Sequence, residues 1–384
     1  QINGLDLSIQ GDYFELLVIL NSENIDSSSL QDQLEALLGN WETFYRNADQ
    51  NHDIMNYKLI ASPDLEVLTE ISRLSGITDL LVLKPVLPVL SRAGLALPFN
   101  NPQEALRYAG NEDLSAGELA VRFESHRAAI GEAEIFEMGR EILKKMQESI
   151  NEGIIGTDYS DRILKSQANK MMVTSRELYG GPTLRKLTAY ITAVMESKSA
   201  MGIIVAAPTA GSCAVLPGTL IALAEEKDFT EQKMVKGLFA AALIGLFIAQ
   251  ASTFAAEECG CQAECGSGSA MAAAGLVEML GGSVSEAFDA ASIAMQNVLG
   301  LICDPVAERV EVPCLGKNVM AGYNALAAAN MVMAGYDKVI PLEETIEALD
   351  QVGRMLPSAL RCTGKAGLSV TKTALAIYRK LCTN

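Results

Sequence analysis

The segment Gly237-Leu-Phe-Ala-Ala-Ala-Leu-Ile-Gly-Leu-Phe-Ile-Ala-Gln-Ala-Ser-Thr-Phe-Ala-Ala256 is the longest apolar run in the chain. By length this run could nearly cross a bilayer, but Gln250, Ser252 and Thr253 interrupt it and no basic cluster flanks it. The run therefore predicts a helix buried in the core of a globular domain.

The sequence around this run is helical as well. From Ser115 onward, Glu-rich and Lys-bearing faces follow a helical pattern and strand signals become scarce. Small residues dominate Ala270 to Leu280 and Ala325 to Ala334, which favours helices whose backbones approach closely. Residues 115–384 are therefore expected to form a mostly α-helical domain.

The N-terminal part has a different pattern. Tyr13 to Leu20 indicates a strand, Leu30 to Leu38 a helix, and Tyr57 to Ala61 a second strand. Residues 1–79 are therefore expected to form a small α/β domain.

Helix-breaking residues separate the two parts. Residues 80–114 contain Pro85, Pro88, Pro98 and Pro102, a density that is typical of a connection between units. A length of 384 residues also fits two domains. The predicted fold class is α+β, with a small N-terminal α/β domain and a mostly α-helical C-terminal domain.

The charge and cysteine content exclude several classes of protein. The 30 Lys and Arg against 47 Asp and Glu give a net charge of −17, which opposes binding to nucleic acid or to anionic membranes. Acidic residues such as Asp6, Asp12 and Glu15 stand where a secretion signal would have a basic start. The eight cysteines are therefore expected to stay reduced, in the cytoplasm.

Three cysteines stand in two segments that are expected to be loops beside helix ends. Cys261 lies in Glu257-Glu-Cys-Gly-Cys-Gln-Ala-Glu-Cys265, and Cys303 and Cys314 bracket the segment between them. Three thiolates leave one corner of a [4Fe-4S] cluster free to act as a Lewis acid. The spacing alone also fits buried apolar thiols, or a structural zinc site with four cysteines.

The motifs around these cysteines resemble a known family. The motifs are, in chain order, Ala207-Pro-Thr-Ala-Gly-Ser-Cys213, Val215-Leu-Pro-Gly218, Gly260-Cys-Gln-Ala-Glu264, Cys303-Asp-Pro-Val306 and Val310-Glu-Val-Pro-Cys314. Together they resemble the α portion of iron-sulfur L-serine dehydratases. The resemblance extends from about Ser115 to Tyr378.

The resemblance implies a reaction and a set of metal ligands. Cys261, Cys303 and Cys314 would hold a [4Fe-4S] cluster, with Cys382 either a removable fourth iron ligand or a frayed tail thiol. The expected reaction is β-elimination on a small β-hydroxy amino acid such as L-serine. It yields a 2-oxo acid and ammonia and needs no pyridoxal phosphate. The C-terminal domain would then be the catalytic one.

Two further segments are candidates for substrate contact and proton transfer. Thr209, Ala210, Gly211 and Ser212 would cradle a substrate carboxylate with backbone N–H groups and hydroxyls, although the same residues also fit an ordinary helix cap. Lys365 is the candidate base, in a segment that resembles a family motif. An exposed lysine without a role is the alternative.

One family segment has no counterpart in this chain. The family carries Ser-Ser-Ser-His-Thr in a β portion, whereas here Ser27-Ser-Ser29 is followed by Leu30, and His52 and His126 lie outside every motif. The chain is therefore expected to form a homo-oligomer or to join a β-type partner chain. The alternatives are a lyase for another β-substituted amino acid such as threonine or cysteine, or a non-catalytic subunit that keeps the cluster.

Overall fold

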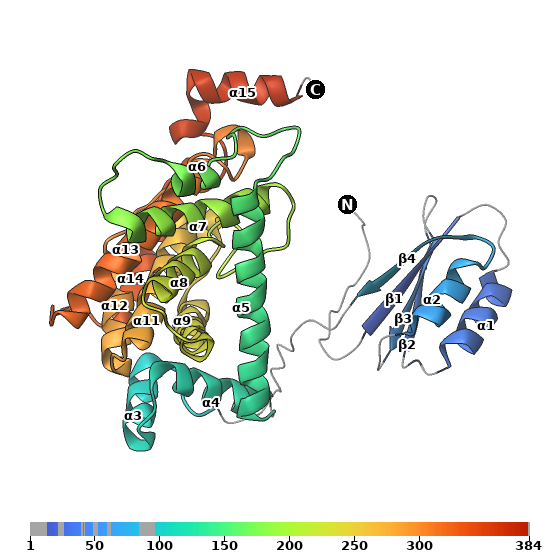
Figure 1. Cartoon of the computed structure of the whole chain (residues 1–384), viewed down its shortest axis with the longest axis horizontal. Helices are drawn as coiled ribbons and strands as arrows, with labels where there is room; N and C mark the ends of the chain where they lie inside the picture. Colours follow the sequence, from blue (N-terminus) through green and yellow to red (C-terminus); the bar gives the residue numbers. More distant parts are fainter. Residues whose placement is uncertain are drawn as a thin grey trace. The chain divides into compact units, whose positions relative to one another are not determined.

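The computed structural model describes residues 14–21, 27–39, 41, 43–48, 53–59, 63–83, 97–128 and 130–382. The chain divides into two compact units, Gln1–Gly94 and Leu95–Asn384 (Figure 1). The fold is α+β, because a small α/β unit precedes a mostly helical one, as the sequence predicted.

The small unit alternates strands and helices. Its elements are β1 (Phe14–Leu20), α1 (Ser27–Leu38), β2 (Thr43–Ala48), β3 (Asp53–Leu59), α2 (Leu65–Ser72) and β4 (Ile77–Leu83). The strands form one antiparallel sheet in the order β2-β3-β1-β4. This βαββαβ order is the split-βαβ, ferredoxin-like arrangement.

Alternation along the central strands builds the core of this unit. One face of the sheet carries the buried side chains of Leu16, Val18 and Leu20 of β1. Across the strand pair, Leu16 faces the buried Tyr57 of β3 and Val18 faces the buried Met55. The two helices cover the sheet on one side (Figure 1). The strand predicted at Tyr13 to Leu20 is confirmed over its described residues. The polar sequence of β2 gave no strand signal.

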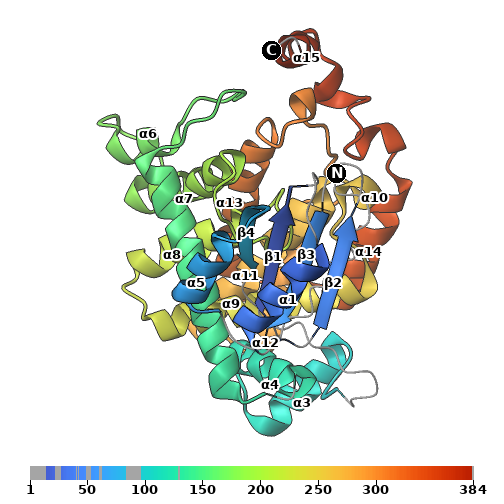
Figure 2. The ribbon, with the colours of Figure 1, turned by 90° about the vertical axis from the view of Figure 1, so that its right-hand side faces the viewer.

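The large unit is built from helices. They are α3 (Pro102–Glu112), α4 (Ala116–Ala128), α5 (Glu132–Ile155), α6 (Ala168–Val173), α7 (Gly181–Ser199), α8 (Val215–Glu226), α9 (Glu231–Ala251), α10 (Ala256–Cys259), α11 (Ser267–Leu280), α12 (Val284–Gln296), α13 (Cys314–Met333), α14 (Leu342–Met355) and α15 (Lys372–Cys382). Short turns are η1 (Gln262–Gly266), η2 (Val306–Glu308), η3 (Ser358–Leu360) and η4 (Gly367–Val370). Within this unit, α3 and α4 lie at one end and α15 at the other in both views (Figures 1 and 2).

The predicted core helix is confirmed as α9. Met234, Leu238, Ile244 and Phe247 are among its buried residues, and α9 packs against α11, which is buried from Ser267 to Met279. By length and composition α9 would suffice to cross a membrane, but 56% of its most apolar window is buried inside the protein. That burial is typical of a core helix in a globular unit.

The connection between the units is shorter than residues 80–114. Pro102 opens α3 inside that segment, because proline fits the first turn of a helix, where its missing N–H costs nothing. The side chain of Asn101 caps the helix by accepting from the N–H of Glu104 at 2.9 Å. One of the four prolines interpreted as breakers is therefore a helix start. Residues 84–96 lie outside the described residues.

Candidate metal centre

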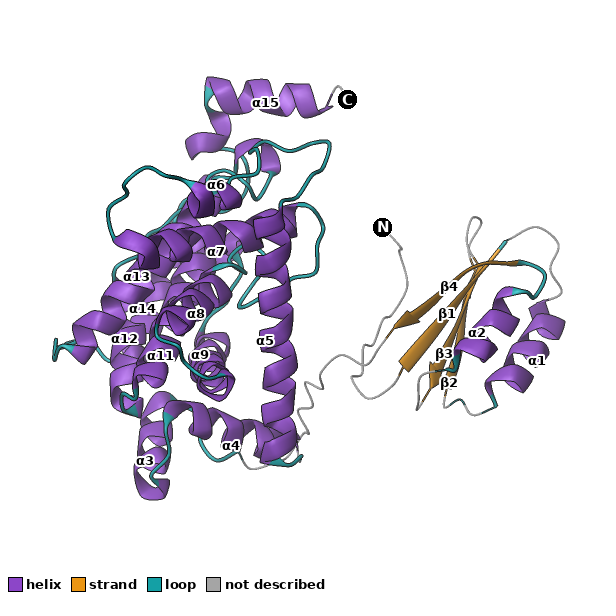
Figure 3. Cartoon of the chain, in the orientation of Figure 1, coloured by secondary structure: helices purple, strands orange, loops and turns teal. Residues whose placement is uncertain are grey.

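The three predicted cysteine ligands are buried in the helical unit, beside or between its helices. Cys261 directly precedes the π-turn η1, and Cys314 is the first residue of α13. Cys303 forms an isolated β-bridge with Arg361. Figure 3 distinguishes the helices of this unit from its loops. All three side chains are buried, with 2%, 4% and 7% of their surface exposed for Cys261, Cys303 and Cys314.

The three thiols lie within range of one another's charges. Burial raises the pKa of Cys303, and it raises the pKa of Cys314 to about 12. The next cause in both cases is the charge of Cys261, which opposes ionisation of the other two thiols. The chain therefore gathers thiols from two distant segments at one buried place.

Backbone hydrogen bonds hold the loops that present these cysteines. The N–H of Cys303 donates to Leu360 O at 2.9 Å, and the N–H of Cys362 donates to Cys303 O at 2.9 Å. Next to Cys261, the side-chain amide of Gln262 donates to Leu349 O at 2.7 Å, and its oxygen accepts from the N–H of Gly300 at 2.7 Å. The π-turn after Cys261 is thus tied to the loop before Cys303 and to α14.

The three thiols are of the donor type that holds iron-sulfur clusters. Among the described residues, no three His, Cys, Asp or Glu side chains converge so as to hold one metal ion. In an iron-sulfur cluster each thiolate binds a different iron, so the sulfur atoms need not meet at one point. Metal binding at this place would require the thiols to lose their protons, because the thiolate is the form that coordinates.

Other thiols lie beside the three. Cys265 hydrogen-bonds the thiol of Cys261, and this hydrogen bond is the largest cause of the lowered pKa of Cys261. Cys362 hydrogen-bonds the thiol of Cys303. Cys382 is exposed at the end of α15 and hydrogen-bonds Tyr378, and in the described part of the chain no interaction joins it to the three cysteines. Its role as a fourth ligand stays a prediction.

The predicted substrate loop adjoins the cysteines. The hydroxyl of Thr209 donates to Glu264 Oε1 at 2.7 Å, and the hydroxyls of Thr209 and buried Ser212 are 3.2 Å apart. A side chain at Gly211 would collide with the carboxylate of Glu264. No side chain caps α8, whose N-cap is Ala214. The local hydrogen bonds therefore favour a polar lining for Thr209–Ser212 over a helix cap.

Asn318 links this loop to the third cysteine. Its amide nitrogen donates to Gly211 O and to Cys314 O, both at 2.9 Å, and approaches Cys265 Sγ at 3.7 Å. Its Oδ1 is buried and has no partner among the described residues. A buried acceptor without a partner costs about 1–3 kcal/mol. A donor on a bound group would relieve this cost, so the surroundings fit a ligand.

Charged side chains surround the same place. Burial raises the pKa of Glu264, against the opposing effect of the hydrogen bond from Thr209. Lys317 donates to Asp304 Oδ1 at 2.8 Å and to Ile302 O at 2.7 Å. Lys198, at the end of α7, interacts electrostatically with Cys314 and Glu264.

Sequence reasoning missed these charged residues. Glu264 is the last residue of the motif Gly260–Glu264, so the sequence could have indicated it as a site residue. Lys198 and Lys317 lie in none of the motifs and gave no such signal. Their position beside the cysteines depends on how the helices pack. The candidate base Lys365 is exposed and His126 is exposed on α4, while His52 lies outside the described residues. A catalytic role for Lys365 stays a prediction.

Comparison with known sequences decides the family. The model of the family described as "Serine dehydratase alpha chain" matches residues 64–369. The chain belongs to this family. The match confirms the resemblance carried by the cysteine motifs, and since dehydratases are lyases it places the chain among the lyases.

The relatives of this chain include proteins named alpha chains and a longer protein named L-serine dehydratase. A "Probable L-serine dehydratase, alpha chain" from Bacillus subtilis is 35% identical over 74% of this chain and 95% of the relative. An "L-serine dehydratase, alpha chain" from Peptoniphilus asaccharolyticus is 45% identical over 52% of this chain and 68% of the relative. "L-serine dehydratase 1" of Escherichia coli is 32% identical over 71% of this chain and 62% of the relative.

Proposed function

We propose that this chain holds a [4Fe-4S] cluster on Cys261, Cys303 and Cys314 and dehydrates L-serine to a 2-oxo acid and ammonia. The observation that supports the proposal most is that three buried thiols lie close enough for their charges to interact, with Glu264 nearby, inside a chain of the serine dehydratase alpha-chain family. The relatives named L-serine dehydratase support serine as the substrate.

The residues around the cysteines divide the work of a β-elimination. When bound, the cluster supplies a Lewis acid that makes the substrate hydroxyl a better leaving group. Thr209 and Ser212 offer hydroxyls to the substrate's polar groups, and Asn318 Oδ1 offers an acceptor for its ammonium group. Burial raises the pKa of Glu264, so its carboxyl holds a proton over a wider pH range and suits the protonation of departing hydroxide.

The hydroxide leaves as water after it takes a proton, and a base, for which Lys365 is the candidate, accepts the Cα proton, so that an aminoacrylate remains. This product tautomerises to an imine, and hydrolysis of the imine in water releases ammonia and the 2-oxo acid. With the leaving group activated by a Lewis acid, the elimination does not depend on the electron sink that pyridoxal phosphate supplies.

The proposal includes a partner chain and a cellular compartment. The Bacillus subtilis and Peptoniphilus asaccharolyticus relatives are named alpha chains, which supports a β-type partner that would supply the missing Ser-Ser-Ser-His-Thr segment. An oxygen-sensitive cluster and eight free cysteines suit a reducing compartment, so we place the protein in the cytoplasm.

Turnover after anaerobic reconstitution tests the function. The chain is treated with iron, sulfide and thiol under argon and then given L-serine, L-threonine or L-cysteine, with and without a β-type partner chain. We expect ammonia and a 2-oxo acid in equal amounts, with the highest kcat/KM for L-serine. A higher kcat/KM for L-threonine or L-cysteine would contradict L-serine as the substrate. A cluster without turnover under every condition would contradict the proposal that the chain is an enzyme.

A further inference from the structure

A lysine without a paired carboxylate lies beside the proposed site. Lys198 is half-buried at the end of α7, and its Nζ donates to the carbonyl oxygen of Val310 at 2.7 Å. An ammonium group has three donors. Among the described residues, no carboxylate lies within ion-pair distance of Lys198, and the Val310 carbonyl is its one hydrogen-bond acceptor.

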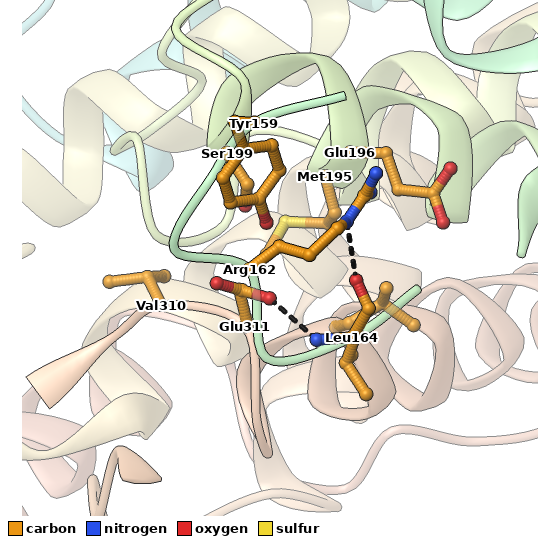
Figure 4. Close-up of a pocket in the computed structure, with 9 residues that line it drawn as sticks. Tyr159, Arg162, Leu164, Met195, Glu196, Ser199, Val310 and Glu311 are labelled. Atoms are coloured by element: carbon orange, nitrogen blue, oxygen red, sulfur yellow. Dashed lines mark hydrogen bonds between the residues drawn. The ribbon is translucent and has the colours of Figure 1, made fainter. Parts of the chain in front are cut away.

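Each carboxylate around Lys198 has other partners. Glu311 Oε2 accepts from the N–H groups of Ile163 at 2.9 Å and Leu164 at 2.8 Å. Figure 4 shows Glu311 turned toward Leu164, with Arg162 donating to the carbonyl of the same residue. Glu311 therefore fastens the segment around Leu164 and does not pair with Lys198.

The remaining two carboxylates are occupied as well. Glu196, one half-turn before Lys198 on α7, accepts from the N–H of Gln167 at 2.6 Å and from the hydroxyl of Ser166 at 3.0 Å. Glu264 accepts from Thr209 at 2.7 Å. The charge of Lys198 is thus compensated only at longer range, by Glu311 and Glu264 and by the thiols of Cys213 and Cys314 when ionised.

Such a lysine is a natural partner for a small anion. Burial lowers the pKa of Lys198, which reflects the cost of keeping its charge away from water. Lysine is a compact point charge with freely oriented donors, so a bound carboxylate would restore most of the lost solvation. The substrates of this reaction carry one such group, the α-carboxylate.

We propose that Lys198 binds the α-carboxylate of the substrate and so restricts the enzyme to free amino acids. The assignment rests on the proposed function, since it uses the site next to Cys314. Lys198 lies near enough to Cys314 and Glu264 for their charges to interact, and Glu264 accepts from Thr209 of the predicted substrate loop.

Binding of two matched probes tests this role without turnover. L-Alanine lacks only the β-hydroxyl of serine, and L-alaninamide also lacks the carboxylate. Calorimetry with the reconstituted wild-type chain is expected to show about tenfold tighter binding of L-alanine, since hydrogen bonds to charged groups contribute about 1.5–3 kcal/mol. Equal affinities in the wild-type protein would overturn the assignment even if every variant misfolded.

Variants then locate the preference. Lys198→Gln keeps a donor for Val310 O but removes the charge, so the preference for L-alanine is expected to disappear. Lys198→Arg restores the charge and should restore part of the preference, which a merely structural role would not do. Lys227→Gln, exposed at the end of α8, is the matched control and should bind as the wild type does.

Kinetics separate binding from proton transfer. With L-serine, Lys198→Gln is expected to raise KM about tenfold or more and to change kcat far less. A fall in kcat with KM and L-alanine affinity unchanged would contradict carboxylate binding. Absence of turnover in the wild-type chain would defeat the proposed function but leave the L-alanine preference as an independent result.

Discussion

At the scale of single residues, buried polar groups organise this protein through hydrogen bonds to backbone atoms. Asp304 pairs with Lys317 at 2.8 Å and also accepts from the N–H of Leu368 at 2.9 Å. The side chains of the pair are 5% and 14% exposed, so removing either partner would leave a buried charge unpaired. The pair fastens the segment after Cys303 to α13, whose first residue is Cys314.

Glu278 provides a residue-scale test of burial. This carboxylate on α11 accepts from the hydroxyl of Ser115 at 2.8 Å and from the N–H of Gly117 at 3.2 Å, where α4 begins. Burial raises its pKa above the ordinary 4.5, and the two hydrogen bonds oppose that rise. The folded state therefore binds the proton more tightly than the unfolded state does.

The sign of the pH dependence follows from this. Stability from Glu278 is fully present below the ordinary glutamate pKa and is lost as pH rises through the raised folded-state pKa. In urea unfolding across this window, Glu278→Gln should show a flatter fall of stability with pH than the wild-type chain. Glu141→Gln, exposed on α5, is the control. Parallel curves for wild type and Glu278→Gln would show that burial of this group has no such effect.

At this scale the sequence predicted the cysteines of the site but not the charged side chains beside them. The motifs around Cys261, Cys303 and Cys314 could be read directly, because each motif is continuous in the chain. Lys198 could not be found in this way. Its place depends on where α7 ends relative to Val310, more than a hundred residues later, and on the other partners of Glu196 and Glu311.

At the scale of elements, close backbone contacts between helices define the core. A Cβ on Gly275 of α11 would lie 2.7 Å from the carbonyl oxygen of Gly237 on α9. Small residues at both positions let the two helices approach, and α11 in turn begins just after Cys261 and Cys265. The apolar run of α9 thus supports the helix that carries one side of the cysteine site.

Gly275→Ala tests this contact. The added methyl group must displace backbone, so we expect a loss of about 1–3 kcal/mol in the free energy of unfolding. The control is Gly110→Ala in α3, where a Cβ meets nothing within 4 Å; there the better helix propensity of alanine should add about 0.5–1 kcal/mol. Equal effects at the two sites in chemical denaturation would refute the close contact.

Element prediction succeeded where periodicity was strong. The helices α9, α11 and α13 follow from long runs of apolar or small residues. The strands β2 and β4 were missed, because Arg46 and Asn47 in one and Thr78 and Asp79 in the other interrupt the expected alternation. The start of α3 was missed because Pro102 indicates a break from one side and a helix start from the other.

At the scale of the whole molecule, the helical unit gathers distant segments. The cysteine site draws on the end of α7, the loop before α8, η1, the loop around Cys303, and the start of α13. These segments come from five places in the chain, so a site of this kind requires the helical unit to be folded. The family match over residues 64–369 covers all of them.

The most direct test of the account is a measurement of iron and acid-labile sulfide per chain after anaerobic reconstitution. The wild-type chain should bind about four of each. Single Cys261→Ser, Cys303→Ser and Cys314→Ser variants should lose most of both, whereas Cys259→Ser should keep them. Full iron and sulfide in any of the three variants, or one tightly bound zinc in place of iron in the wild-type chain, would contradict the three-cysteine cluster.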